Sequence, residues 1–123
     1  MSHTLSLSAG PVETASTSSS GDTVVISLPN VDVGDLIVIA AYWFSASITI
    51  TSVTISGESN ATLLTLNSST GNQRVQLAYL LKATTGGTKT ITITFSSSTT
   101  FHRGGWAAAF APGSGNVSTF VAE

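Results

Sequence analysis

Alternation of apolar and hydroxylated side chains is the strongest constraint that this sequence places on its fold. In residues 88–95, TKTITITF, Ile91, Ile93 and Phe95 share one parity and threonines occupy the other. A period of two is that of a β-strand, whose successive side chains point to opposite faces. No stretch of the chain fits the apolar period of an amphipathic helix better than it fits alternation. The sequence therefore predicts an all-β protein.

Glycine, proline and asparagine interrupt the chain at short intervals and leave segments of strand length between them. Eight or nine such segments predict a two-sheet antiparallel β-sandwich with no substantial helix. Eight core strands favour a jelly-roll-like arrangement over an immunoglobulin-like one. The candidate strands are residues 4–8, 23–28, 35–44, 48–56, 61–66, 73–82, 88–95, 105–111 and 117–121.

Residues 48–56 alternate with a change of phase. Ile48 and Ile50 are even-numbered, whereas Val53 and Ile55 are odd-numbered. A strand can hold all four on one face only if it contains an extra residue. A bulge or bend is therefore predicted near residues 51–52.

Residues 36–44, LIVIAAYWF, form the longest apolar run. A membrane helix needs about 20 such residues, so this run is predicted to be a strand and no membrane is expected. Both of its faces are apolar. One fills the sandwich and the other needs a cover, because monomers rarely expose large apolar patches. The cover is an N-terminal arm, another subunit or a different protein. Ile37, Ile39 and Trp43 are the predicted interface residues, with their even-numbered neighbours as the alternative.

The aromatic residues of the strands are expected to pack mainly in the core. Tyr42, Trp43, Trp106 and Phe110 lie in alternating apolar segments, and a sugar-binding platform is the alternative. Tyr42 and Trp43 are adjacent, so one of them must point away from the sandwich. In residues 73–82 the expected inward set is Val75, Leu77, Tyr79 and Leu81.

Few side chains are charged. Charged residues make up 8% of the 123-residue chain, against about 25% in an average protein, and the net charge is −2. Serine and threonine number 20 and 19, nearly a third of the chain. No basic cluster is present, so nucleic-acid binding is not expected. The absence of cysteine excludes disulfides and thiolate chemistry.

The segment Asn30 to Asp35 contains two carboxylates around a glycine and is a weak calcium candidate through Asp32 and Asp35. Calcium takes six to eight oxygen ligands, usually with more carboxylates than this. The favoured interpretation is a turn before a strand, with Gly34 at positive φ and the aspartates bonded to nearby N–H groups. No metal and no cofactor are predicted.

His102 and Arg103 precede the glycines of the segment HRGGW. The favoured interpretation is a solvated loop pair, and the alternative is a polar contact between subunits. Abundant serine is the only feature that suggests a hydrolase, and no G-x-S-x-G nucleophile elbow is present. We therefore predict no catalytic residue and no enzymatic activity.

Four segments together resemble a family of small β-sandwich domains. They are PNVDVGDLIVIAAYWF (29–44), ITSVTISGESNATLLTL (50–66), RVQLAYLLKATTGGTKTITITFS (74–96) and GGWAAAFAPGSG (104–115), and the likeness spans about residues 22–115. Such domains occur in bacterial surface proteins and in phage structural proteins, including capsid decoration and fibre-associated chains. The resemblance implies a sandwich and a non-catalytic role.

A single domain is predicted, with residues 22–123 as the sandwich and residues 1–21 as a flexible N-terminal arm or first strand. Residues 1–21 lack the pattern of a secretion signal, so assembly in the host cytoplasm is expected. The leading hypothesis is a phage capsid decoration or cement protein: a virion structural protein that binds the major capsid protein on the capsid surface as a homotrimer. A glycan-binding module of a phage fibre or bacterial surface protein and a self-assembling filament subunit are the alternatives.

Overall fold

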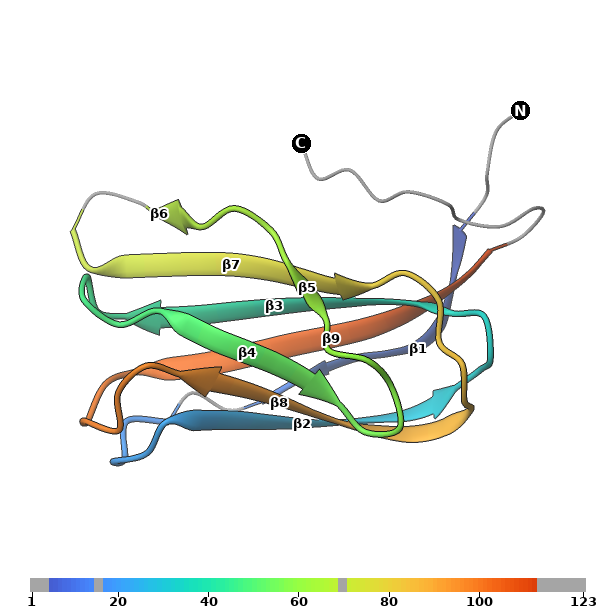
Figure 1. The fold of residues 1–123 in the computed structure, drawn as a ribbon, viewed down its shortest axis with the longest axis horizontal. Coiled ribbons are helices and arrows are strands. Elements are labelled where there is room, and N and C mark those ends of the chain that lie inside the picture. The colour runs from blue at the N-terminus through green and yellow to red at the C-terminus, as the bar shows by residue number, and fades with distance from the viewer. Residues whose placement is uncertain (1–4, 15–16, 69–70, 113–123) are drawn as a thin grey trace.

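The computed structural model describes residues 5–14, 17–68 and 71–112, and within them the chain forms nine strands and no helix. The strands make two antiparallel sheets stacked face to face (Figure 1). The predicted all-β sandwich is therefore confirmed. The strands are β1 Leu5–Glu13, β2 Thr23–Val31, β3 Leu36–Phe44, β4 Ile50–Ile55, β5 Thr62–Leu63, β6 Asn67–Ser68, β7 Gln73–Leu80, β8 Gly87–Phe95 and β9 Arg103–Pro112.

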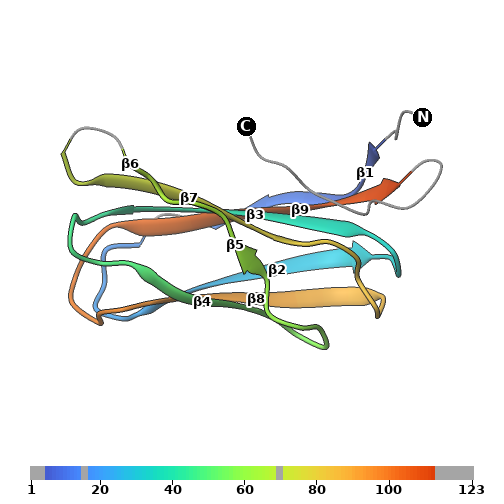
Figure 2. The same ribbon diagram turned by 45° about the horizontal axis from the view of Figure 1, so that its top comes forward.

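The strand order is that of a jelly roll. The six-stranded sheet runs β1-β9-β3-β7-β5, with β6 also paired to β7, and the three-stranded sheet runs β2-β8-β4. The pairs β1–β9, β2–β8 and β3–β7 are nested like the two arms of one long hairpin, and strands β1 to β4 alternate between the sheets. Figure 2 shows the two layers edge-on, with the six-stranded sheet above. A rolled hairpin of this kind is the jelly-roll-like arrangement that the sequence predicts.

The N-terminal segment contributes a strand. Residues 5–13 form β1 and pair with β9 at the edge of the six-stranded sheet, with register shifts between Leu7 and Val12. Residues 1–21 are predicted as a flexible arm or as a first strand, and in the described part of this segment the structure has a first strand. The predicted strand at residues 117–121 lies outside the described residues.

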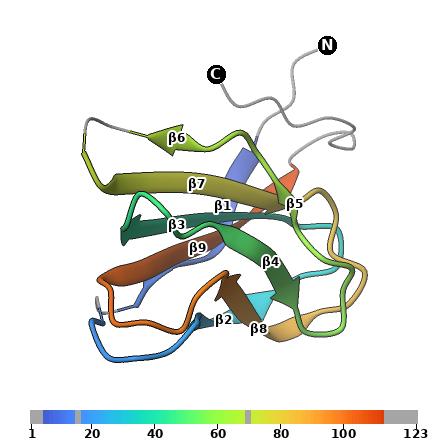
Figure 3. The ribbon, with the colours of Figure 1, turned by 60° about the vertical axis from the view of Figure 1, so that its left-hand side comes forward.

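The core side chains lie between the two sheets. Figure 3 shows the two sheets with one end of the sandwich turned toward the viewer. Trp43 of β3 is its largest fully buried side chain. The indole nitrogen of Trp43 donates a hydrogen bond of 2.9 Å to the carbonyl oxygen of Ile48, so its polar atom is satisfied inside the core. The Phe95 ring packs edge-on against the Trp43 ring and against the Phe101 ring, at centroid distances of 5.4 and 5.3 Å.

The predicted bulge in the fourth strand is present. The register of β4 against β8 shifts between Ile50 and Ser52. As a result Ile48, Ile50, Val53 and Ile55 are all buried despite their change of parity. The irregularity keeps one apolar face continuous against the core.

The prediction of which face of β7 points inward was wrong. Ala78 and Leu80 are buried in the core, whereas Val75, Leu77 and Tyr79 lie on the opposite face of the strand. The six-stranded sheet consequently has large apolar side chains on its outer side.

Candidate functional site: the outer face of the six-stranded sheet

The surface turned away from the three-stranded sheet carries the aromatic side chains that the core does not use. Directly paired residues of neighbouring antiparallel strands share a face. Val38 of β3 thus lies in one row with Tyr79 of β7 and Ala108 of β9. We call this surface the aromatic face. It comprises Leu36, Val38, Ala40, Tyr42 and Phe44 of β3, Val75, Leu77 and Tyr79 of β7, and Gly104, Trp106, Ala108 and Phe110 of β9.

The aromatic face is apolar, uncharged and partly open to solvent. Phe44 and Val75 are 51% and 46% exposed, and the rings of Tyr42, Tyr79 and Trp106 are half-buried. None of the residues that define the face is charged. Large contiguous apolar surfaces are common at interaction sites, which makes this face the candidate site.

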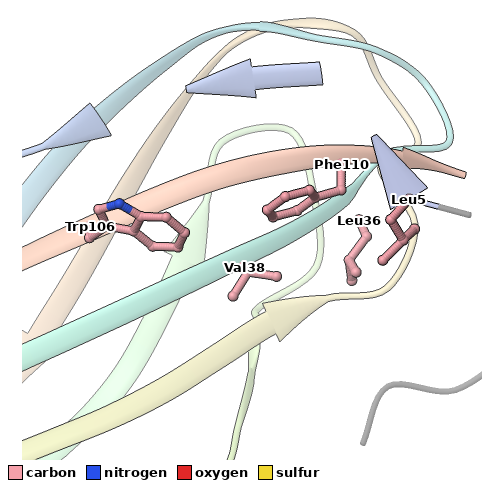
Figure 4. Close-up of a pocket in the computed structure, with 5 residues that line it drawn as sticks. All are labelled: Leu5, Leu36, Val38, Trp106 and Phe110. Carbon is pink, nitrogen blue, oxygen red and sulfur yellow. The ribbon is translucent and has the colours of Figure 1, made fainter. Parts of the chain in front are cut away.

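A pocket of about 330 Å³ opens on the aromatic face near the start of β3. Its lining comes from three strands, with Trp106 and Phe110 on β9, Leu36 and Val38 on β3, and Leu5 on β1 (Figure 4). The indole N–H of Trp106 is the one polar side-chain group in this lining. Such a pocket suits an apolar side chain or another apolar group, because it offers few hydrogen bonds to a polar one.

Two adjacent glycines of β9 let side chains approach the strand closely from both sides. A Cβ atom at Gly104 would overlap the phenol of Tyr42, so the tyrosine ring lies directly across this position of the aromatic face. A Cβ atom at Gly105 would lie 2.9 Å from Cδ1 of Ile26 in the opposing sheet. The pair therefore supports the packing of both the aromatic face and the core.

The interface residues predicted in β3 are on the other side of the sheet. Ile37, Ile39 and Trp43 are fully buried between the two sheets. The structure therefore corrects this prediction, and the even-numbered residues of β3 are the ones that face away from the core. Of the aromatic residues expected in the core, only Trp43 lies there, whereas Tyr42, Trp106 and Phe110 face outward.

His102 and Arg103 have different environments. His102 is exposed, while Arg103 is 4% exposed and points into the domain. Arg103 donates hydrogen bonds from Nη1 to the Ser19 oxygen (2.8 Å) and from Nε to the Thr23 oxygen (3.1 Å). Its guanidinium also lies 4.9 Å from the ring centroid of Phe101. Neither prediction for Arg103, a solvated loop residue or a subunit contact, fits this burial.

Asp32 and Asp35 form the predicted turn. The Asp35 carboxylate accepts a hydrogen bond of 3.0 Å from the Asp32 amide, and the Asp35 amide donates to the Asp32 oxygen at 3.1 Å. Gly34 between them has a φ of 97°, which favours glycine. Nowhere in residues 5–14, 17–68 and 71–112 do three metal-ligating side chains gather. The arrangement around Asp35 is that of a structural turn.

A buried ion pair that the sequence analysis missed lies at the opposite end of the sandwich from His102. The Glu58 carboxylate accepts hydrogen bonds from the amides and hydroxyls of Thr84 and Thr85 and pairs with Lys89 Nζ at 3.2 Å. Lys89 also donates to the Thr85 hydroxyl. Burial alone would raise the pKa of Glu58, but these hydrogen bonds lower it to about 2. The network ties the β4–β5 loop to the β7–β8 connection and leaves no open site.

Comparison with protein-family models, with curated proteins and with solved structures gives no match for this chain. No helix in the described part of the chain is long and apolar enough to cross a membrane. A functional assignment therefore depends on the geometry of the aromatic face.

Proposed function

We propose that this chain is a non-enzymatic structural protein of a virion, which decorates or cements a phage capsid. The observation that carries the proposal is the aromatic face, an uncharged apolar surface that is partly open to solvent. In this role the protein assembles in the host cytoplasm and binds the major capsid protein as a homotrimer. The function requires no cofactor and no catalytic residue.

The scaffold and the composition support this proposal. Jelly rolls are recurrent in viral capsid domains and in lectins. The chain has only 8% charged residues, and the cores of protein interfaces are depleted in charge. The resemblance of residues 22–115 to domains of phage structural proteins favours the same class.

The proposed mechanism is burial of apolar surface. Covering Tyr42, Tyr79 and Trp106 would remove aromatic and aliphatic surface from water, and the non-directional gain scales with the area covered. Aromatic side chains of this type carry much of the affinity at protein interfaces. Copies joined by such contacts would clamp neighbouring capsid proteins without any chemical step.

A glycan-binding module is the second candidate, because half-exposed rings such as Trp106 can stack on sugars. Sugar hydroxyls also require several convergent hydrogen-bonding groups. The pocket beside Trp106 is lined otherwise by Leu5, Leu36, Val38 and Phe110, which offer no side-chain hydrogen bond. The geometry therefore favours a protein partner over a glycan.

Co-sedimentation tests the proposal. Purified protein is mixed with capsids assembled from the major capsid protein of the same phage, and bound protein is measured in the pellet. We expect saturable binding and a higher temperature of capsid disruption. Protein that stays in the supernatant and leaves capsid stability unchanged would contradict the proposal, and binding on a glycan array would support the second candidate.

A further inference from the structure

We infer that the aromatic face is covered by another copy of the same chain. The inference deepens the proposed function and rests on it in taking the decorating unit to be a homo-oligomer. It concerns which surface joins the copies, and its test needs no capsid. The contact residues are those of β3, β7 and β9 that point away from the core, with Val75 and Phe44 the most exposed among them.

Charge makes this surface compatible with itself. When copies of one chain meet around a symmetry axis, residues near the axis face their own counterparts, so any charge there meets a like charge. The outward residues of the three central strands include no Asp, Glu, Lys or Arg. Self-association through these three strands therefore brings no like charges together. Glu13 of the edge strand β1, which pairs with Trp106, is a carboxylate at the rim of this surface. A partner recognised by charge complementarity would find no charge to bind on the three central strands.

The size of the face meets the requirement of a stable contact. The edge strand β1 extends the face, because its exposed Leu7 pairs with Phe110 and its Leu5 lines the pocket. The strands β1, β9, β3 and β7 contain 9, 10, 9 and 8 residues. At about 3.3 Å per residue and about 4.8 Å between strands, they span roughly 600 Å². Two such faces together bury about 1,200 Å², the lower limit of the usual range for specific interfaces.

The face also contains both a hollow and protruding side chains. The pocket is built around Leu36 and Val38 at the start of β3, whereas Phe44 and Val75 stand exposed at its other end. These two regions are roughly 20 Å apart along the strand, so one copy cannot bring them together. A second copy can place its own exposed side chains over the pocket. The contact can close as a reciprocal pair or as a ring of three, the expected homotrimer.

Sedimentation velocity with a matched pair of variants tests the inference. Val75 on the aromatic face and Val25 on the outer face of the three-stranded sheet are both strand valines, 46% and 54% exposed. We expect the wild-type chain and Val25→Glu to sediment as an oligomer of the 12.5-kDa chain and Val75→Glu to sediment as a monomer. A monomeric wild-type chain, or a Val75→Glu variant as oligomeric as the wild type, would overturn the inference.

Cysteine variants keep the test decisive if Val75→Glu fails to fold. The chain has no cysteine, so Val75→Cys and Val25→Cys each introduce a single thiol. With a short bis-maleimide we expect covalent dimers in a mixture of Val75→Cys with Val38→Cys, a position that lines the pocket, and none in a mixture of Val25→Cys with Val38→Cys. Equal cross-linking in both mixtures would contradict the inference. Binding of a monomer to capsids would refute this inference and the homotrimer, and it would leave the proposed decoration of the capsid standing. An oligomer that does not bind capsids would refute the proposed function and leave this inference standing.

Discussion

At the scale of single residues, Gly104 makes room for Tyr42 on the aromatic face. Because a Cβ atom here would overlap the phenol, Gly104→Ala should displace the ring and destabilise the domain by about 1–3 kcal/mol. Urea unfolding measures this change. A double-mutant cycle provides the control: in a Tyr42→Ala background the same glycine substitution should cost much less. Equal costs in both backgrounds would show that the tyrosine is not the reason for glycine.

The Glu58 carboxyl should make the free energy of unfolding depend on pH. The pKa of its carboxyl is lowered from 4.5 to about 2 in the folded chain, so the folded state binds this proton less tightly than the unfolded state. The resulting stabilisation is complete above pH 4.5 and is lost as the pH falls toward 2. We expect it to be on the order of 2 kcal/mol, after allowance for solvent screening.

Urea unfolding of the wild type and of Glu58→Gln between pH 2 and 7 tests this dependence. The difference between the two should be largest near neutral pH and should shrink as the medium becomes acidic. Glu13→Gln, which changes an exposed carboxylate on β1, is the control and should follow the wild type. A difference that is constant over the whole range would contradict the assignment.

The sequence indicates that Lys89 is buried but not which residue pairs with it. Lys89 has the same parity as Ile91 and Ile93, a signal that its side chain enters the sandwich. Its partner Glu58 is 31 positions away along the chain. Alternation reports the face of a strand but not the partner across a loop, so the ion pair could not be predicted.

At the scale of elements, Arg103 connects the start of β9 to the segment that leads into β2. Besides the bonds of its side chain to Ser19 and Thr23, its backbone forms a bridge with Thr17. Lysine cannot reproduce the planar set of donors. Arg103→Lys should cost about 1–3 kcal/mol and should speed amide exchange in residues 17–23.

Hydrogen exchange with mass spectrometry checks this prediction. Arg74→Lys is the matched control, because Arg74 donates to the nearby carbonyls of Gly71 and Gln73 and not to residues 17–23 among the bonds that the described residues form. It should leave exchange in residues 17–23 unchanged. Equal exchange in both variants would mean that Arg103 does not hold the segment.

The elements also show how much of the fold the sequence predicts. Alternation located β3, β4, β7, β8 and β9 and the bulge in β4, because these features depend only on local side-chain pattern. It did not determine which face of β3 or β7 points inward. Both faces of these strands are apolar, and the choice depends on where the opposing sheet lies. The large side chains of Val75, Leu77 and Tyr79 indicate a core face, yet the face of β7 that packs in the core carries the smaller Ala78.

At the scale of the whole molecule, the two outer surfaces of the sandwich differ in chemistry. The outer face of the three-stranded sheet carries hydroxyls. On this face Thr92 lies between Val25 and Thr54, and Thr94 lies between Thr23 and Ser52. The outer face of the six-stranded sheet carries the aromatic residues. Threonine on a pleated surface is well solvated and suits strands. In the proposed assembly this asymmetry would orient the protein, with its apolar side toward a second copy and its hydroxylated side toward solvent.

Hydroxyl-radical footprinting with mass spectrometry tests most directly whether the aromatic face is the binding surface. It reports the solvent exposure of individual side chains in the assembled protein and in the Val75→Glu variant. We predict that Tyr42, Tyr79 and Trp106 are protected in the assembled protein and become reactive in the variant, while the exposed His102 reacts equally in both. Equal reactivity of the three aromatic residues in both samples would contradict the assignment of this face.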